Sequence, residues 1–144
     1  VYWELKPTFY TNCNKKRYFL SKNIDRCPRE KFRINLSALI TSCTNKNKQI
    51  ILCIDLNKDT TCSNVLLYQT LLHENNLIDA LKSRHEDLAP PETHNRGTKP
   101  IDAILVSESC CNIIQAGWLE FKSNLGDHRV AYIDIKASDI INKD

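Results

Sequence analysis

Apolar residues recur at helical spacing in the stretch that follows residue 27. Pro28 suits the first turn of a helix, where its missing N–H has no intrahelical partner, and Glu30 places a negative charge near the same end. A polar run from Thr44 to Lys48 ends the pattern. The sequence therefore predicts a helix that begins at Pro28 and has one apolar face. The residues of that face are Phe32, Leu36, Leu39, Ile40 and Cys43.

The next segment, Gln49–Asp55, is a nearly continuous apolar run with the sequence QIILCID. Such a run is typical of a strand that is buried on both faces. It ends in Asp55 and Asn57, whose polar side chains would lie at one edge of the sheet. The sequence therefore predicts a buried strand with an acidic C-terminal end.

The middle of the chain combines helical patterns with residues that interrupt them. Ser63 can cap a second helix, which has leucines between Leu66 and Leu72. Asn75-Asn76 breaks this helix, and Leu77–Leu81 predicts another short helical piece. Pro90-Pro91 then marks a turn or loop.

Three strands are predicted in the C-terminal half, at 101–106, 113–121 and 129–135. Gly117 would be a bulge or bend in the second. If the three form a meander, the first and third run in the same direction and begin at the same edge. A strand over 49–55 that ran the opposite way would end at that edge. One acidic cluster with a histidine results, made of Asp55, Asn57, Asp102, Asp127 and His128.

This predicted cluster has the parts of a hydrolytic metal site. Carboxylate and amide oxygens suit Mg²⁺. A hydrogen bond from the His128 ring to the Asp102 carboxylate would orient His128 as a base or phosphate contact. Asp55 would orient or deprotonate a water, and Asn57 would hold a phosphate oxygen, as metal-assisted phosphodiester hydrolysis requires. Spacing alone leaves two other interpretations open: Asp127-His128 as a surface turn, and Asp-x-Asn as a helix-entry turn.

Composition and charge narrow the class of protein. A chain of 144 residues with 42% hydrophobic and 26% charged residues fits one soluble globular domain, or one lobe of a larger domain. No apolar run approaches the roughly 20 residues of a membrane span, so no membrane partner is expected. The net charge is +3, and eight basic residues crowd the segment from Lys15 to Arg33. That segment predicts either a solvated loop and helix face or a surface that follows phosphates.

The cysteines and the N-terminus bear on location and domain organisation. None of the seven cysteines forms a C-x-x-C motif, which argues against a structural zinc site. We expect a reducing compartment, and therefore an intracellular protein of the nucleus or cytoplasm. The chain starts at Val1 without an initiating Met or a signal peptide, which suggests the interior of a longer protein. Residues 1–4 predict the end of a strand, and residues 5–27 predict a long polar loop.

Three segments stand in the order of motifs in a known family: Ile54–Asn57 (IDLN), Pro100–Ser107 (PIDAILVS) and Gly126–Arg129 (GDHR). They resemble the C-terminal half of the endonuclease/exonuclease/phosphatase family, which includes DNase I, apurinic endonucleases and retrotransposon endonuclease domains. Ser21–Glu30 and Thr93–Gly97 resemble the retroelement-type members in particular. The resemblance implies that the whole chain, 1–144, is a partial domain of this family. Its expected fold is the C-terminal portion of a DNase I-like α/β sandwich, with a mostly antiparallel sheet and flanking helices.

The resemblance also implies roles for single residues. Asp55 would activate the attacking water, Asn57 would steady the phosphate, and Asp102 would be the carboxylate partner of the catalytic His128. Asp127 would lie near the metal, which is Mg²⁺ with Mn²⁺ as the alternative. Three further residues are expected to contact substrate: Tyr2, which matches an active-site tyrosine, and His94 and Arg96, whose loop would face the site.

Departures from the family pattern separate three functional hypotheses. Ile54 stands where the family has Gly, and Gly126 stands where it has Ser. The family's N-terminal strands, which carry an Asn and a metal-binding Glu, have no counterpart here. The first hypothesis is a Mg²⁺-dependent endonuclease acting on DNA, of which this chain is the C-terminal half of the active site; its partners would be DNA and either a second copy or the missing N-terminal lobe. The alternatives are an inactive retroelement fragment that binds nucleic acid and a phosphatase of the same family.

Overall fold

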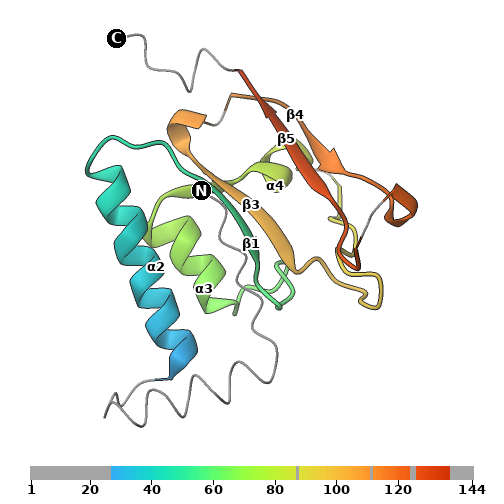
Figure 1. Cartoon of the computed structure of the whole chain (residues 1–144), viewed down its shortest axis with the longest axis horizontal. Coiled ribbons are helices and arrows are strands. Elements are labelled where there is room, and N and C mark those ends of the chain that lie inside the picture. The colour runs from blue at the N-terminus through green and yellow to red at the C-terminus, as the bar shows by residue number, and fades with distance from the viewer. Residues whose placement is uncertain (1–26, 87, 111, 124–125, 137–144) are drawn as a thin grey trace.

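The computed structural model describes residues 27–86, 88–110, 112–123 and 126–136 (Figure 1). Within these ranges the protein is a mixed α/β structure with antiparallel sheets and flanking helices. The strand predicted at 1–4, the loop over 5–26, the candidate Tyr2 and the basic residues before Cys27 lie outside the described residues. None of the described helices is long and apolar enough to cross a membrane.

The elements follow one another as short helices and strands. The helices are α2 (Pro28–Thr44), α3 (Leu66–Gln69) with the π-helical turn η1 (Thr70–Glu74), α4 (Ala80–Arg84), and the 3₁₀ turns η2 (Glu108–Cys110) and η3 (Phe121–Ser123). The strands are β1 (Ile51–Asp55), β2 (Leu77–Asp79), β3 (Asp102–Ser107), β4 (Ile113–Trp118) and β5 (Ala131–Ile135).

Strand β3 contributes side chains to two hydrophobic cores, one on each of its faces. It lies between β1 and β2 in an antiparallel sheet, and β4 and β5 form a second antiparallel sheet. Ala103 and Leu105 belong to the core that α2, α3 and η1 cover, whereas Ile104 and Val106 belong to the core with α4, β4 and β5. In Figure 1 the helices α2 and α3 accordingly lie on one side of β1 and β3, and β4 and β5 lie on the other. Because side chains alternate between the two faces of a strand, β3 packs against the helices on one face and against the second sheet on the other.

The predicted first helix is confirmed. It begins at Pro28, spans 17 residues and ends at Thr44. The chain then turns through Asn47, whose φ of 54° is left-handed and suits an asparagine. The break at Asn75-Asn76 is also confirmed, because η1 ends at Glu74 and Asn76 has a φ of 52°.

The prediction that Gln49–Asp55 is buried on both faces is wrong. The strand β1 starts at Ile51 and is an edge of its sheet among the described residues, with Ile51 48% exposed and Cys53 exposed. The strand buried on both faces is β3, in which all four middle residues are buried. An apolar run indicates a strand, but its place in the sheet depends on pairing partners far away in the sequence.

Two helix predictions in the middle of the chain are also wrong. Leu77–Leu81 is not one helical piece: residues 77–79 pair with β3 as β2, and the helix starts at Ala80 because the Asp79 carboxylate accepts the N–H groups of Leu81 and Lys82, both at 3.0 Å. Ser63 does not cap the second helix. That helix starts at Leu66 after Val65, which is buried in the first core, so packing sets its start.

The predicted meander is wrong in one respect. In the described residues β3 pairs with β1 and β2, whereas β4 pairs with β5, so the first and third predicted strands lie in different sheets. The register irregularity of β4 lies between Ile113 and Gln115 and not at Gly117. Gly117 instead lets Tyr132 approach closely, because a Cβ there would lie 3.0 Å from the Tyr132 hydroxyl.

Replacing Leu105 by Ala tests the central position of β3. Leu105 is 0% exposed in the first core, so we expect the free energy of unfolding to fall by about 3 kcal/mol through lost burial and a residual cavity. Urea unfolding followed by circular dichroism measures the change. The control is Leu39→Ala, because Leu39 is 59% exposed on α2 and should change stability by less than about 0.5 kcal/mol. Equal losses in the two variants would contradict the assigned core.

Candidate active site

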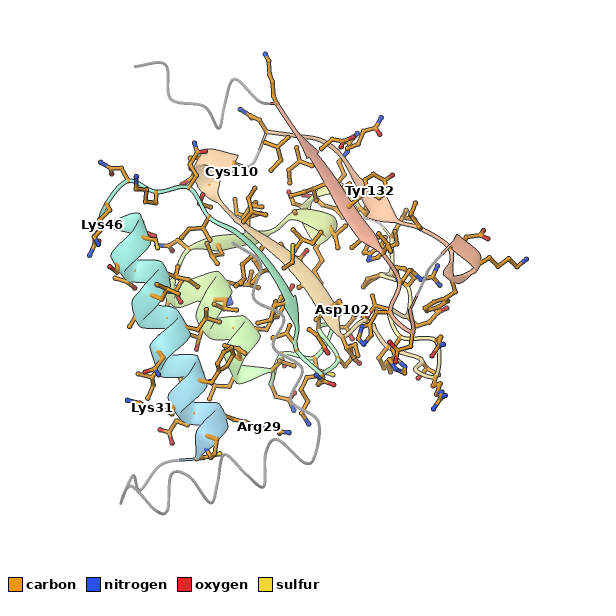
Figure 2. All side chains as sticks on the ribbon, in the orientation of Figure 1. Arg29, Lys31, Lys46, Asp102, Cys110 and Tyr132 are labelled. Atoms are coloured by element: carbon orange, nitrogen blue, oxygen red, sulfur yellow. The ribbon has the colours of Figure 1, made fainter. Side chains whose placement is uncertain are left out.

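The candidate site begins with two carboxylates at the paired ends of β1 and β3. Asp55 is the last residue of β1 and lies directly opposite Asp102, the first residue of β3. The Leu56 N–H donates to the Ile101 carbonyl at 2.8 Å, which continues the ladder one step beyond the strands. The antiparallel pairing of β1 with β3 meets the condition on which the predicted cluster depends, and it brings Asp55 and Asp102 to one edge. Figure 2 shows Asp102 at this end of β3.

His128 reaches the same edge from the segment before β5. Its Nδ1 lies 2.9 Å from Asp102 Oδ2, and both side chains are about three-quarters buried, with exposed fractions of 28% and 21%. A carboxylate accepts hydrogen bonds, so Asp102 holds the imidazole proton on Nδ1. In the neutral ring Nε2 is then the basic nitrogen. The pairing of Asp102 with His128 predicted from the sequence is thus present in the structure, although Asp102 begins a strand of the first sheet and His128 precedes a strand of the second.

The buried Thr93 places these two parts relative to each other. Its hydroxyl accepts the N–H groups of Ile101 and Asp102 at 2.9 and 3.2 Å, and its carbonyl accepts the Arg129 N–H at 2.7 Å. Thr93 is 1% exposed. One residue therefore binds the backbone on both sides of the Asp102–His128 pair. The sequence does not predict this role of Thr93, because a threonine in a loop carries no signal of a contact eight residues ahead.

Asn57 holds the Asp55 carboxylate. Its backbone N–H donates to Asp55 Oδ1 at 2.8 Å, and its Nδ2 donates to Asp55 Oδ2 at 2.9 Å. The φ of Asn57 is 50°, a left-handed conformation that asparagine tolerates better than most residues. The side chain expected to steady a phosphate therefore also orients the neighbouring acid.

The environment of Asp55 favours its neutral form. Burial raises the pKa of the Asp55 carboxyl above its ordinary value of 3.8, and the nearby Asp102 carboxylate raises it further. The hydrogen bonds from Asn57 and the charge of His128 lower the pKa in part. A raised carboxyl pKa is common in catalytic and metal-binding sites. The ionised carboxylate is unfavourable there, and a bound cation or proton removes that energetic cost.

His94 and Asp127 complete the cluster. His94 forms an antiparallel backbone bridge with His128, and the two ring centroids lie 5.0 Å apart in an edge-to-face arrangement. The His94 Nε2 lies 3.5 Å from Asp127 Oδ2, and the Asn95 N–H donates to the Asp127 carbonyl at 2.9 Å. Arg96 is exposed, and its backbone N–H donates to His94 Nδ1 at 3.1 Å. All candidate site residues predicted from the sequence except Tyr2 are among the described residues.

Two groups of these residues could hold a metal ion. They are Asp55–Asp102–His128 and His94–Asp127–His128, and in each group the ligand atoms lie within 4.8 Å of one another. The first group offers two carboxylates beside one imidazole, which suits a hard cation that keeps several waters. The second offers two imidazoles and one carboxylate, a donor set that borderline metals prefer. His128 belongs to both groups, so it is the centre of the candidate site.

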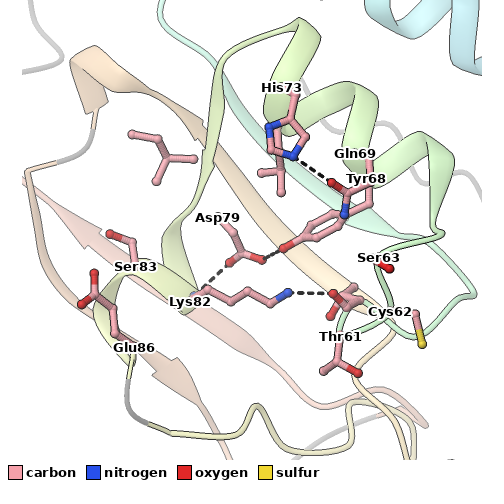
Figure 3. Close-up of a pocket in the computed structure, with 13 residues that line it drawn as sticks. Thr61, Cys62, Ser63, Tyr68, Gln69, His73, Asp79, Lys82, Ser83 and Glu86 are labelled. Atoms are coloured by element: carbon pink, nitrogen blue, oxygen red, sulfur yellow. Dashed lines mark hydrogen bonds between the residues drawn. The ribbon is translucent and has the colours of Figure 1, made fainter.

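A separate hollow on the surface has a structural explanation (Figure 3). The Tyr68 hydroxyl donates to Asp79 Oδ2 at 2.5 Å, while Asp79 Oδ1 caps α4. The Lys82 ammonium donates to the Thr60 carbonyl at 2.7 Å and lies 4.7 Å from the centre of the Tyr68 ring. Burial, together with the Asp79 carboxylate, raises the pKa of Tyr68 well above its ordinary value. These groups bind one another, and they hold α3, β2 and α4 together.

Comparison with known proteins does not identify the chain. No protein-family model, no curated protein and no solved structure matches it. The function must therefore be inferred from the geometry of the Asp55, Asp102 and His128 side chains themselves.

Replacing Asp55 by Asn tests the electrostatic cost of the site. The pKa of Asp55 is raised in the folded state, so protonated Asp55 stabilises the fold at low pH, and this contribution is lost as the pH rises through the folded-state pKa. An Asn at this position has one acceptor oxygen and loses the hydrogen bond from Asn57 Nδ2, so the test is the pH trend and not the melting temperature at one pH. In metal-free buffer the melting temperature of Asp55→Asn relative to the wild type should rise from pH 3.8, below which Asp55 is protonated in both states, to pH 7, because only the wild type then carries the charge.

Differential scanning calorimetry at several pH values measures this difference. Asp134→Asn is the matched control, because it removes the same charge from an exposed position on β5. A melting temperature of Asp55→Asn that does not rise relative to the wild type between pH 3.8 and pH 7 would contradict the predicted cost of the Asp55 charge.

Proposed function

We propose that this chain carries the C-terminal half of the active site of a Mg²⁺-dependent endonuclease, which hydrolyses phosphodiester bonds in DNA. The observation that carries the proposal is the 2.9 Å hydrogen bond between His128 Nδ1 and Asp102 Oδ2, formed beside the Asp55 carboxylate. A base oriented by one acid next to a second acid is the arrangement that metal-assisted phosphodiester hydrolysis uses. The order of these motifs along the chain supports a DNase I-like sandwich as the parent fold.

Each side chain has a chemical task in this reaction. Mg²⁺ would neutralise the charge of the phosphate and lower the pKa of water, and Asp55 and Asp102 would be oxygen donors to it. Asp102 keeps the His128 proton on Nδ1. The lone pair of Nε2 can therefore accept a proton from water or a hydrogen bond from a protonated phosphate oxygen. Asn57 fixes the rotamer of Asp55 with one N–H of its amide group. The second N–H of that group can donate to a phosphate oxygen.

The charges around the cluster support a nucleic-acid substrate. Lys58 follows Asn57 directly, Arg96 lies two residues after His94, and both residues are exposed. Cations placed beside a cleavage site attract the neighbouring phosphates of a polynucleotide, whereas a small phosphoester has no neighbouring phosphates. DNA is therefore favoured over a single phosphate group as the substrate.

Nicking of supercoiled plasmid by the purified 144-residue chain tests the proposal. We expect nicking that requires Mg²⁺ or Mn²⁺, stops with EDTA, and falls on the order of 10²–10⁴-fold in His128→Ala, because the general base is lost. The matched control is His73→Ala. His73 is exposed on η1, where its ring nitrogen lies 2.8 Å from Gln69 Oε1, so the variant should nick at the wild-type rate.

A second measurement separates metal binding from hydrolysis. Mn²⁺ bound at the cluster should broaden the NMR signals of the Asp55, Asp102 and His128 backbone amides before those of η1. An intact plasmid together with this selective broadening would contradict hydrolysis by this chain and favour a binding fragment. An intact plasmid without selective broadening would overturn both parts of the proposal.

A further inference from the structure

The ring of His94 has a defined tautomer. The Arg96 backbone N–H donates to His94 Nδ1 at 3.1 Å, so this nitrogen carries a lone pair and the ring proton lies on Nε2. Nε2 is directed at an anion, the Asp127 carboxylate, at 3.5 Å. The distance is long for a hydrogen bond, and the Asp127 side chain is 58% exposed, so this contact is loose. His94 thus presents an N–H donor at the rim of the cluster.

The backbone around His94 is held much more firmly than its contact with Asp127. His94 and His128 form a backbone bridge, the Arg129 N–H donates to the Thr93 carbonyl at 2.7 Å, and the Gly97 N–H donates to the His94 carbonyl at 2.9 Å. The Thr93 hydroxyl also binds the first residues of β3. The position of the His94 backbone relative to the Asp102–His128 pair is therefore fixed before any substrate arrives, and the hydrogen bond from the Arg96 N–H orients the ring.

The tautomer also decides between an anion and a cation as the partner of Nε2. A metal ion needs the lone pair of the nitrogen that it binds, but Nε2 carries a hydrogen while Nδ1 accepts from Arg96. The group His94–Asp127–His128 has the donors for a metal, yet the arrangement of the His94 ring suits an oxygen anion instead. A phosphate oxygen beside His128 is such an anion.

We infer that His94 is a catalytic residue that binds the scissile phosphodiester, with Nε2–H donating to a non-bridging phosphate oxygen. The inference rests on the proposed phosphodiester substrate and adds a fixed donor for the charge that grows on the phosphate during hydrolysis. A preorganised donor of this kind, on a ring whose centre lies 5.0 Å from the His128 ring centre, contributes where charge develops. A phosphate oxygen would replace the Asp127 carboxylate as the acceptor of this donor.

Substitutions that move or retain the donor test this role. His94→Asn should lower kcat/KM for plasmid nicking on the order of 10²-fold, because its amide ends near the Nδ1 position and leaves no donor at Nε2. His94→Gln should recover most of the lost rate, because its amide nitrogen lies close to the position of Nε2. His73→Asn is the matched control on exposed η1. Circular dichroism verifies that all three variants fold.

A binding measurement keeps the test independent of turnover. Long-range ¹H–¹⁵N NMR should show the His94 proton on Nε2, and titration with the dinucleotide dTpdT should shift that signal but not the His73 signal. If dTpdT shifts His94 while the wild type leaves plasmid intact, the contact stands and the proposed hydrolysis fails. If the wild type nicks plasmid and His94→Asn nicks equally well, the proposed hydrolysis stands and the His94 inference is overturned. A His94 proton found on Nδ1 would overturn the inference directly.

Discussion

The register between β1 and β3 is the constraint on which both the core and the candidate site depend. The same pairing that sets Asp55 opposite Asp102 also turns Leu105 towards the helices and Ile104 towards the second sheet. Side chains alternate along a strand, so a slip of one residue would reverse both faces of β3 and separate the two acids. The packing of the two cores therefore selects the geometry of the site, and no residue of the site needs to stabilise the fold by itself.

That register has an electrostatic cost. Burial at this edge raises the pKa of Asp55, and the Asp102 carboxylate beside it raises the pKa further. The hydrogen bonds from Asn57 offset part of the cost, and the pairing of Asp102 with His128 places a group beside the acids that can carry a positive charge. Sites that store repulsion in this way bind cations readily, because the cation removes a penalty that the folded protein already has.

The sequence predicted those features that depend on neighbouring residues. Pro28 and the polar run after Thr44 defined α2 because helix ends are local. The direction of β1 against β3 was a condition of the predicted cluster, and the structure meets it. The edge position of β1 and the pairing of β2 with β3 were not predicted, because both depend on partners about 26 to 55 residues away in the sequence. Asp102 and His128 came together although the predicted meander was wrong, since two sheets that face each other can align their edges as one sheet does.

Thr93 connects the two sheets at the candidate site. Its hydroxyl accepts hydrogen bonds from the backbone at the start of β3, and its carbonyl accepts one from the segment that leads into β5. The cores on either side of β3 consist of non-directional apolar contacts, which survive small sliding movements between layers. Hydrogen bonds of this length do not survive such movements. A shear of the layers by about an ångström would thus separate His128 from Asp102 while leaving the protein compact, so in this fold the alignment of that pair is more fragile than the folded state itself.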